Sequence, residues 1–219
     1  MNRPAVSLRG LYAITPESAD TAALLPRVAA CLAGGAAVVQ YRAKDLPRAA
    51  MREQASAIAR LCREHGALCI VNDDVALARA VGAHGVHLGR DDASVQAVRA
   101  EWRDGVIGVS CYAEPGRARE GAAAGADYVA IGSVFPSPTK PHAVRAPLHL
   151  LREAAELCGL PVVAIGGITL ANAPGAIDAG ADMVAVISAL FDAPDVEAAA
   201  RAFTRLFQAP RPGALHVRP

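Results

Sequence analysis

The sequence predicts an α/β protein, a single-domain (β/α)8 barrel of the TIM type. Eight short runs rich in β-branched and apolar residues alternate with alanine-, leucine- and arginine-rich segments, without a linker between them. The runs are apolar almost throughout, which is typical of parallel strands that are covered on both faces. We predict strands at Leu11–Thr15, Val38–Arg42, Cys69–Asp73, Gly85–Gly89, Val106–Ser110, Tyr128–Ser133, Val162–Gly167 and Met183–Ser188.

The segments between the predicted strands are typical of amphipathic helices. Examples are Pro47–His65, with Glu53 and Arg60 on its polar side, and Ser94–Arg103. An open doubly wound sheet is the rival fold, but no G-x-G-x-x-G sequence follows the first predicted strand. Glycine ends most helical segments, because it adopts a positive φ at little cost. These glycines are Gly34, Gly35, Gly66, Gly82, Gly125, Gly159 and Gly180.

The composition fits one globular domain, since 53% of the 219 residues are hydrophobic and 20% are charged. We expect residues 1–208 to form the barrel and residues 209–219, with three prolines, to form a poorly ordered tail. A formal net charge of +1 gives no reason to expect nucleic acid or a membrane as a partner. A homo-oligomer is compatible with the sequence.

The sequence also indicates a reducing, cytoplasmic location. The five cysteines are scattered and form no Cys-x-x-Cys pair, so we expect neither a disulfide framework nor a zinc site. The first residues lack the long apolar run of a signal peptide. The uncharged stretch Gly159–Ile177 approaches the length of a membrane span, but prolines and glycines divide it into short pieces.

Polar residues accumulate where the predicted strands end, and active sites of such barrels lie at that end. Alternation along the second strand puts Gln40 and Arg42 on one face, and Lys44 continues that face into the loop. Taken alone, this basic loop fits a solvated rim as well as it fits an anion site.

Carboxylates follow the third and fourth predicted strands. Asp73 and Asp92 either form a salt-bridge network with the basic residues or hold Mg²⁺, which takes one or two carboxylates together with phosphate oxygens. We expect Asp74 and Asp91 to be helix caps or first-turn residues, and His87 to be a hydrogen-bonded residue of the barrel.

The later strand ends predict an anion site. Ser110 ends the fifth strand, and a proline-rich loop with Ser137, Thr139 and Lys140 follows the sixth. Gly167 leaves room for a backbone approach to phosphate, and the loops after strands seven and eight often bind phosphate in these barrels. A tight turn is the alternative reading of the glycine pair.

From Leu11 to about Phe207 the chain resembles the thiamine phosphate synthase family. The resemblance rests on short motifs at the strand ends, in a fixed order. These are Gln40-x-Arg42-x-Lys44, Val71-Asn72-Asp73, His87-x-Gly89-x-x-Asp92, Gly108-Val109-Ser110, Ser137-Pro138-Thr139-Lys140, Ile165-Gly166-Gly167-Ile168 and Val186-Ile187-Ser188.

The resemblance implies a Mg²⁺-assisted transferase that joins a hydroxymethylpyrimidine pyrophosphate to a thiazole phosphate. It implies that Asp73 and Asp92 bind the metal and that Arg42, Lys44, Ser110 and Lys140 are catalytic. Pyrophosphate would leave a pyrimidinylmethyl carbon, and the thiazole nitrogen would attack the resulting cation. The implied substrate-binding residues are Gln40, Tyr41, Arg42, Ala43, Lys44, Asn72, Ser110, Ser137, Pro138, Thr139, Lys140, Gly167, Ile187 and Ser188.

Departures from the family pattern are small, and two other functions stay open. Arg90 stands where the family has glutamine, which adds a cation near the metal site. A thiazole tautomerase-like isomerase would share the barrel, but Tyr112 stands where its catalytic histidine is expected. A phosphate-ligand binding protein without turnover is the second alternative.

Overall fold

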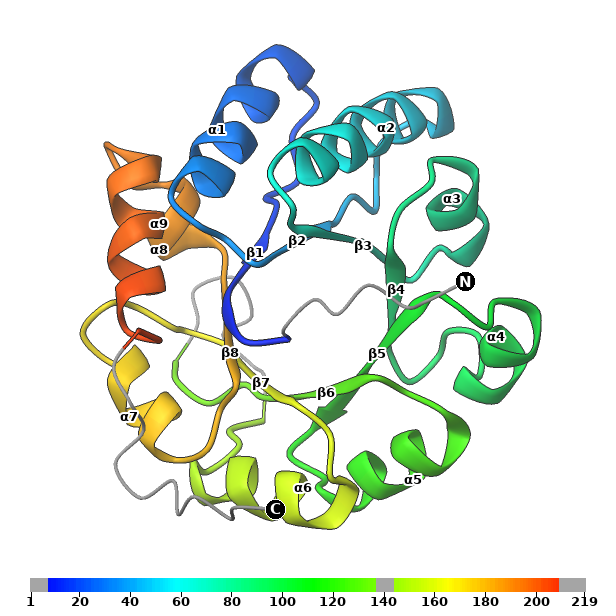
Figure 1. The fold of residues 1–219 in the computed structure, drawn as a ribbon, viewed down its shortest axis with the longest axis vertical. Helices are drawn as coiled ribbons and strands as arrows, with labels where there is room; N and C mark the ends of the chain where they lie inside the picture. The colour runs from blue at the N-terminus through cyan, green and yellow to red at the C-terminus, as the bar shows by residue number, and fades with distance from the viewer. Residues whose placement is uncertain (1–7, 137–143, 209–219) are drawn as a thin grey trace.

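The computed structural model describes residues 8–136 and 144–208 and confirms the predicted closed barrel. The expected tail, residues 209–219, lies outside the described residues. Eight parallel strands pair in chain order, and β8 pairs with β1 to close the ring (Figure 1). The strands are β1 (Gly10–Ile14), β2 (Val38–Tyr41), β3 (Leu68–Asn72), β4 (Gly85–Leu88), β5 (Val106–Tyr112), β6 (Tyr128–Ile131), β7 (Val162–Ile165) and β8 (Met183–Val186).

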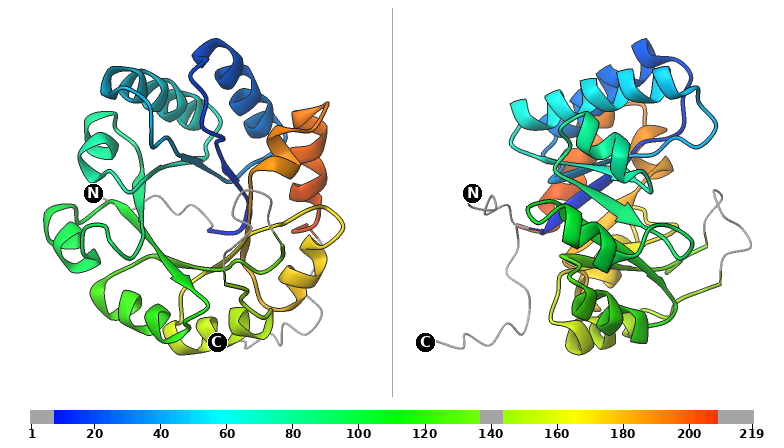
Figure 2. Two further views of the ribbon diagram at one scale, coloured as in Figure 1. Left: turned by 180° about the vertical axis from the view of Figure 1, so that it is seen from behind. Right: turned by 90° about the vertical axis from the view of Figure 1, so that its right-hand side faces the viewer.

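Helices surround the strands on the outside, as the two views of Figure 2 show. Each strand leads into a helix, and β8 leads into a short helix and then a longer one that packs beside α1. In the described residues the helices are α1 (Thr21–Ala33), α2 (Arg48–Glu64), α3 (Val75–Ala80), α4 (Val95–Glu101), α5 (Gly116–Ala124), α6 (His149–Cys158), α7 (Ala173–Asp178), α8 (Ser188–Phe191) and α9 (Val196–Arg205).

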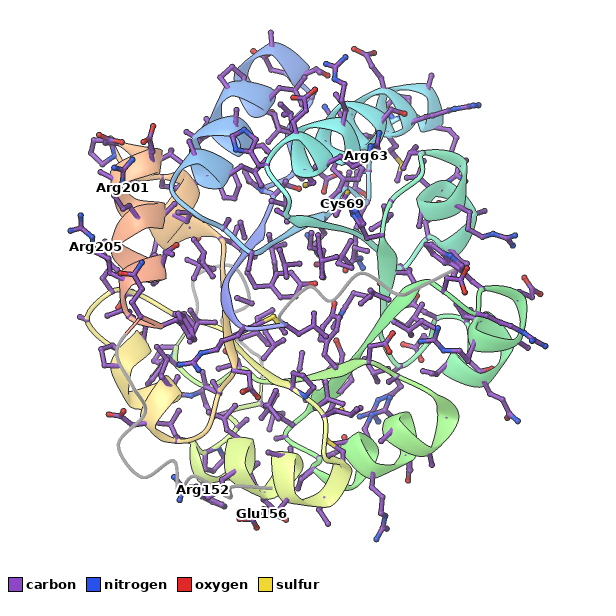
Figure 3. All side chains as sticks on the ribbon, in the orientation of Figure 1. Arg63, Cys69, Arg152, Glu156, Arg201 and Arg205 are labelled. Atoms are coloured by element: carbon purple, nitrogen blue, oxygen red, sulfur yellow. The ribbon has the colours of Figure 1, made fainter. Side chains whose placement is uncertain are left out.

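Alternation along the strands divides the core into two layers. On β1, Tyr12 and Ile14 belong to the layer inside the barrel, whereas Leu11 and Ala13 pack in the layer between strands and helices. Figure 3 shows side chains filling the centre of the ring, so the barrel is a packed core. The charged residues labelled on α6 and α9 point away from it, which explains the mixed polar and apolar pattern of the helices.

The strands end one residue earlier than predicted at β1 to β4 and two residues earlier at β6, β7 and β8, whereas β5 ends two residues later. β7 ends at Ile165 because Gly166 and Gly167 turn the chain with φ values of +103° and +62°. Ser188 was expected to end the last strand, but it begins α8. The predicted strand ends therefore form the loops that surround the mouth of the barrel.

Helix caps confirm one prediction and correct another. Asp74 caps α3 and accepts a hydrogen bond from the amide of Leu77, as expected. Asp91 is neither a cap nor a first-turn residue, because Ser94 caps α4 by accepting from Ala97. The cysteines are free thiols, four of them buried. Within residues 8–136 and 144–208, no helix has both the length and the apolarity that a membrane crossing requires.

Candidate active site

A cavity of about 1080 Å³ opens where the carboxyl ends of the strands meet. Barrel closure brings to it side chains that are far apart in the chain, from β1 near the start to the loop after β8. Seven of the predicted site residues line it: Gln40, Arg42, Asn72, Ser110, Gly167, Ile187 and Ser188.

The basic segment after β2 is held by two residues that follow β1. Thr15 Oγ1 accepts a hydrogen bond from the Arg42 amide at 3.0 Å. Glu17 Oε1 accepts from the amides of Lys44 and Asp45 at 2.9 and 2.6 Å. These donated hydrogen bonds hold the pKa of the Glu17 carboxyl below its ordinary value, so Glu17 stays ionised and anchors the loop.

The two predicted metal-binding carboxylates lie close together beside Lys44. The Lys44 ammonium is 3.5 Å from Asp73 Oδ2, and Asp92 accepts a hydrogen bond from the Gly89 amide at 2.6 Å. Burial raises the pKa of Asp73, and its contact with Asp92 raises it further, while Lys44 opposes the shift. Two carboxyl groups in this arrangement repel each other when both are ionised, and a bound cation relieves that repulsion.

His87 is buried inside the barrel and hydrogen-bonded, as predicted. Its Nδ1 lies 3.1 Å from the Tyr128 hydroxyl, and its Nε2 lies 2.9 Å from Ser110 Oγ. Burial lowers its pKa to about 4, so the ring is neutral at pH 7. His87 therefore contacts a predicted catalytic serine and also lines the cavity.

The glycines after β7 are required by packing between loops. A Cβ at Gly167 would lie 2.1 Å from the Pro136 carbonyl oxygen, and one at Gly166 would lie 2.1 Å from Ser133 Oγ. The space that we assigned to a phosphate approach is thus partly filled by the chain after β6. Gly167 nevertheless lines the cavity, so its backbone faces the ligand space.

Other predicted residues lie elsewhere. The Tyr41 side chain points outward and donates to Gln54 Oε1 on α2 at 3.0 Å, and Tyr41 does not line the cavity. Ala43 packs against the outer core layer and does not line the cavity. Ser137, Pro138, Thr139 and Lys140 lie outside the described residues.

Arg90 was expected near the metal site, but its contacts with Glu114 and Tyr112 and the contribution of Tyr12 were not predicted from the sequence. Arg90 pairs with Glu114 and lies over the Tyr112 ring, 5.1 Å from its centroid. All three residues line the cavity, so the extra cation is partly neutralised by a carboxylate. Tyr12 of β1 also lines the cavity, although its sequence pattern is that of an ordinary aromatic residue in a strand.

Relatives that share more than half of their aligned residues with this chain are thiamine-phosphate synthases. The sequence profile of thiamine monophosphate synthase matches residues 11–190. A thiamine-phosphate synthase of Chromobacterium violaceum is 55% identical over 203 residues, covering 92% of this chain and 98% of that protein. One from Thiobacillus denitrificans is 56% identical over 201 residues, covering 91% and 95%.

Solved structures agree with the sequence comparisons. Thiamine phosphate pyrophosphorylase from Pyrococcus furiosus is 36% identical with a TM-score of 0.83, covering 92% of this chain and 96% of that chain. 3-Hexulose-6-phosphate synthase has a TM-score of 0.65 at 21% identity, covering 90% and 99%. At that identity the second likeness concerns the fold alone.

Proposed function

The chain belongs to the thiamine monophosphate synthase family, and on that basis we propose that its cavity joins a hydroxymethylpyrimidine pyrophosphate to a thiazole phosphate. The products are thiamine phosphate and pyrophosphate. The observation that carries the proposal is the pairing of Asp73 with Asp92 beside Lys44, next to a cavity lined by Arg42 and Asn72.

The pyrimidine pyrophosphate is assigned to the mouth of β2–β5. Arg42 and Lys44 supply positive charge to the pyrophosphate, and Gln40, Asn72 and Ser110 supply hydrogen bonds. Lys140 would add a second ammonium from the loop after β6, an assignment that rests on the family resemblance.

Mg²⁺ is the metal that the residues fit best. Two adjacent carboxylates, one with a raised pKa, match an ion that prefers oxygen ligands and completes its shell with phosphate oxygens and waters. Within the described residues no cluster of three or more candidate ligands exists, so phosphate oxygens of the substrate and waters would complete the shell around Asp73 and Asp92. Asp73 and Asp92 would hold the ion, which would supply positive charge next to the departing pyrophosphate.

The thiazole phosphate is assigned to the loops after β7 and β8, where Gly167, Ile187 and Ser188 line the cavity. These loops are the usual phosphate site of the (β/α)8 barrel. Ser137, Pro138 and Thr139 would complete this end, again by family resemblance. The two substrates then meet inside one cavity, which removes much of the entropic cost of their encounter.

The chemistry requires no side-chain nucleophile. Negative charge grows on the leaving oxygens as the carbon–oxygen bond breaks, so Arg42 and Lys44 bind the transition state more strongly than the ground state. The apolar part of the cavity, including Val163 and Ile165, limits access of water to the pyrimidinylmethyl cation. The thiazole nitrogen is then the nearest nucleophile.

The direct test is product formation by the purified protein from the two phosphorylated halves, with Mg²⁺ and with a chelator. We expect thiamine phosphate and stoichiometric pyrophosphate only with the metal. Absence of product from folded, metal-supplied protein would overturn the proposal and favour an isomerase or a binding protein.

Asp92→Asn tests the metal assignment, because the asparagine oxygen can still accept from Gly89 while its charge is lost. We expect turnover to fall by about 10²–10³-fold, the effect of losing one transition-state electrostatic contact. Asp91→Asn is the matched control at the neighbouring exposed position, and turnover should be unchanged. Equal activity of the two variants would contradict the assignment.

A further inference from the structure

Five polar side chains form a continuous hydrogen-bonded chain across the inside of the barrel. Gln40 Nε2 lies 2.8 Å from the Tyr12 hydroxyl, which lies 2.8 Å from the Tyr128 hydroxyl. The chain continues to His87 Nδ1 at 3.1 Å and from His87 Nε2 to Ser110 Oγ at 2.9 Å. We call these residues the interior relay. They come from five different strands, and both ends of the relay, Gln40 and Ser110, line the cavity.

The Gln40 amide sets a direction that the other hydrogen bonds of the relay can follow. The Gln40 amide nitrogen only donates, so the Tyr12 oxygen accepts and the Tyr12 proton can be donated to Tyr128. In this direction Tyr128 donates to His87 Nδ1, and the ring proton is then on Nε2. Nε2 donates to Ser110, whose own proton is therefore available to an acceptor in the cavity.

Rotating the Gln40 side-chain amide by 180° would exchange donor and acceptor at every hydrogen bond of the relay. Its oxygen would accept from Tyr12, the ring proton of His87 would move to Nδ1, and Ser110 would donate to His87 instead of to a ligand. If one part of the relay ran in one direction and the rest in the other, a buried donor or acceptor would lack its partner within the relay, which is costly. The two ends of the relay are consequently coupled.

We propose that the interior relay is a positioning device: a ligand N–H group bound to the Gln40 carbonyl oxygen fixes Ser110 as a hydrogen-bond donor to that same ligand. Among the described residues Gln40 Oε1 has no hydrogen-bond partner, and it faces the cavity end of the relay. The inference rests on the proposed function, in which the ligand is the aminopyrimidine pyrophosphate. Tyr12, Tyr128 and His87 are then positioning residues.

Tyr128 is the member that tests this inference most cleanly. It is fully buried and is not among the residues that line the cavity. The Tyr128 hydroxyl requires glycine at position 108, because a Cβ on Gly108 would lie 2.3 Å from the Tyr128 hydroxyl oxygen. Tyr128→Phe therefore removes one O–H group from the relay and keeps the ring that stacks on His87.

The kinetic experiment is a double-mutant cycle of Tyr128→Phe and Ser110→Ala, assayed with Mg²⁺ and both substrates. We expect Tyr128→Phe alone to lower kcat by about five- to tenfold, the usual effect of one hydrogen bond, with the KM for thiazole phosphate unchanged. In the Ser110→Ala background the same substitution should have no further effect on kcat. If the double variant instead lost kcat by the product of the two single-variant factors, Tyr128 would act independently of Ser110, and the inference would be overturned.

The ¹⁵N chemical shifts of the His87 ring give a readout that needs no turnover. We expect the protonated nitrogen to be Nε2 in the wild-type protein, assigned by comparison with His87→Gln. A ring protonated on Nδ1 would overturn the direction of the relay. This result is independent of product formation, so failure of the relay and failure of the proposed function are distinguishable.

Discussion

Single side chains outside the recognised motifs determine the geometry of the basic segment. Glu17 is exposed, yet it binds two amides of the loop that carries Lys44. It thereby ties the loop after β1 to the loop after β2, and the position of the ammonium depends on this contact. The Lys44 side chain is restrained further by its ion pair with Asp73, the residue that follows β3.

Glu17→Ala should therefore weaken catalysis without unfolding the barrel. Loss of the two hydrogen bonds should lower kcat/KM for the pyrimidine pyrophosphate by about tenfold, measured by steady-state kinetics. Glu17→Gln retains the accepting oxygen and should keep most of the activity. If both variants lose activity equally, the carboxylate charge rather than its hydrogen bonds is what matters.

His87 makes the stability of the protein depend on pH. Its pKa falls from an ordinary value of 6.5 to about 4 on burial, partly opposed by Asp92, so the unfolded chain binds more protons between these values. The stability that the neutral His87 ring contributes is therefore fully present above pH 6.5 and is lost as the pH falls to about 4. At about 1.4 kcal/mol per pKa unit, the contribution is about 3 kcal/mol.

Urea unfolding of the wild type and of His87→Gln at several pH values measures this contribution. The wild type should lose about 3 kcal/mol more than the variant between pH 6.5 and pH 4. Asp73, whose pKa is raised, changes stability in the opposite direction but is present in both proteins. Parallel pH profiles would show that His87 does not titrate as inferred.

The sequence allowed prediction of residues that reach the cavity from the end of a strand, such as Arg42 and Asn72. It did not allow prediction of contacts inside the barrel. Gln40 and Tyr12 are 28 residues apart, and Tyr12 and Tyr128 are 116 apart. Which inward residues meet depends on the stagger of the closed sheet, and a strand-by-strand reading does not contain that stagger.

At the level of whole elements, close packing of α9 against α1 completes the helical layer. Gly34 follows α1, and a Cβ there would lie 2.4 Å from the Ala200 Cβ and 2.6 Å from the Glu197 carbonyl oxygen. Thr204 of α9 also donates to the Gly34 carbonyl oxygen at 3.0 Å. The helix that follows β8 is thus held against the first helix of the chain.

Gly34→Ala should separate these two helices. Gly34 has a φ of −75°, which alanine adopts freely, so the cost is steric alone. We expect a loss of roughly 1–3 kcal/mol in the free energy of unfolding, measured with urea. Gly116→Ala is the matched control in α5, where nothing lies within 4 Å, and it should be neutral or slightly stabilising. A neutral Gly34→Ala would mean that α9 shifts without cost.

The order and type of the elements could be predicted because apolar runs, helical segments and glycines recur along the chain. The ends of the elements were less predictable. β5 continues to Tyr112 with a shift in register after Ser110, and this irregularity belongs to its pairing with β6. Ser188 has the local pattern of a strand but begins α8, since tertiary packing there outweighs local preference.

For the molecule as a whole, closure of the barrel is what assembles the candidate active site. The cavity is lined by residues from all eight strands or the loops that follow them, so no isolated part of the chain contains it. The loop that carries Lys140 lies outside the described residues, and its contribution stays a prediction. A ligand that spans several strands should accordingly stabilise the complete barrel, because it binds only the folded state.

Magnesium pyrophosphate tests this coupling between ligand and fold. At about 100 times its dissociation constant it should add about 2.7 kcal/mol to the free energy of unfolding, which raises the Tm by about 5–10 °C. Pyrophosphate without the metal should add less, because the repulsion between Asp73 and Asp92 then remains. In Asp92→Asn the increment due to Mg²⁺ should disappear, whereas Asp91→Asn should retain it. Equal shifts with and without Mg²⁺ in the wild type would place the pyrophosphate away from the carboxylate pair, and the metal site would have to be sought elsewhere in the chain.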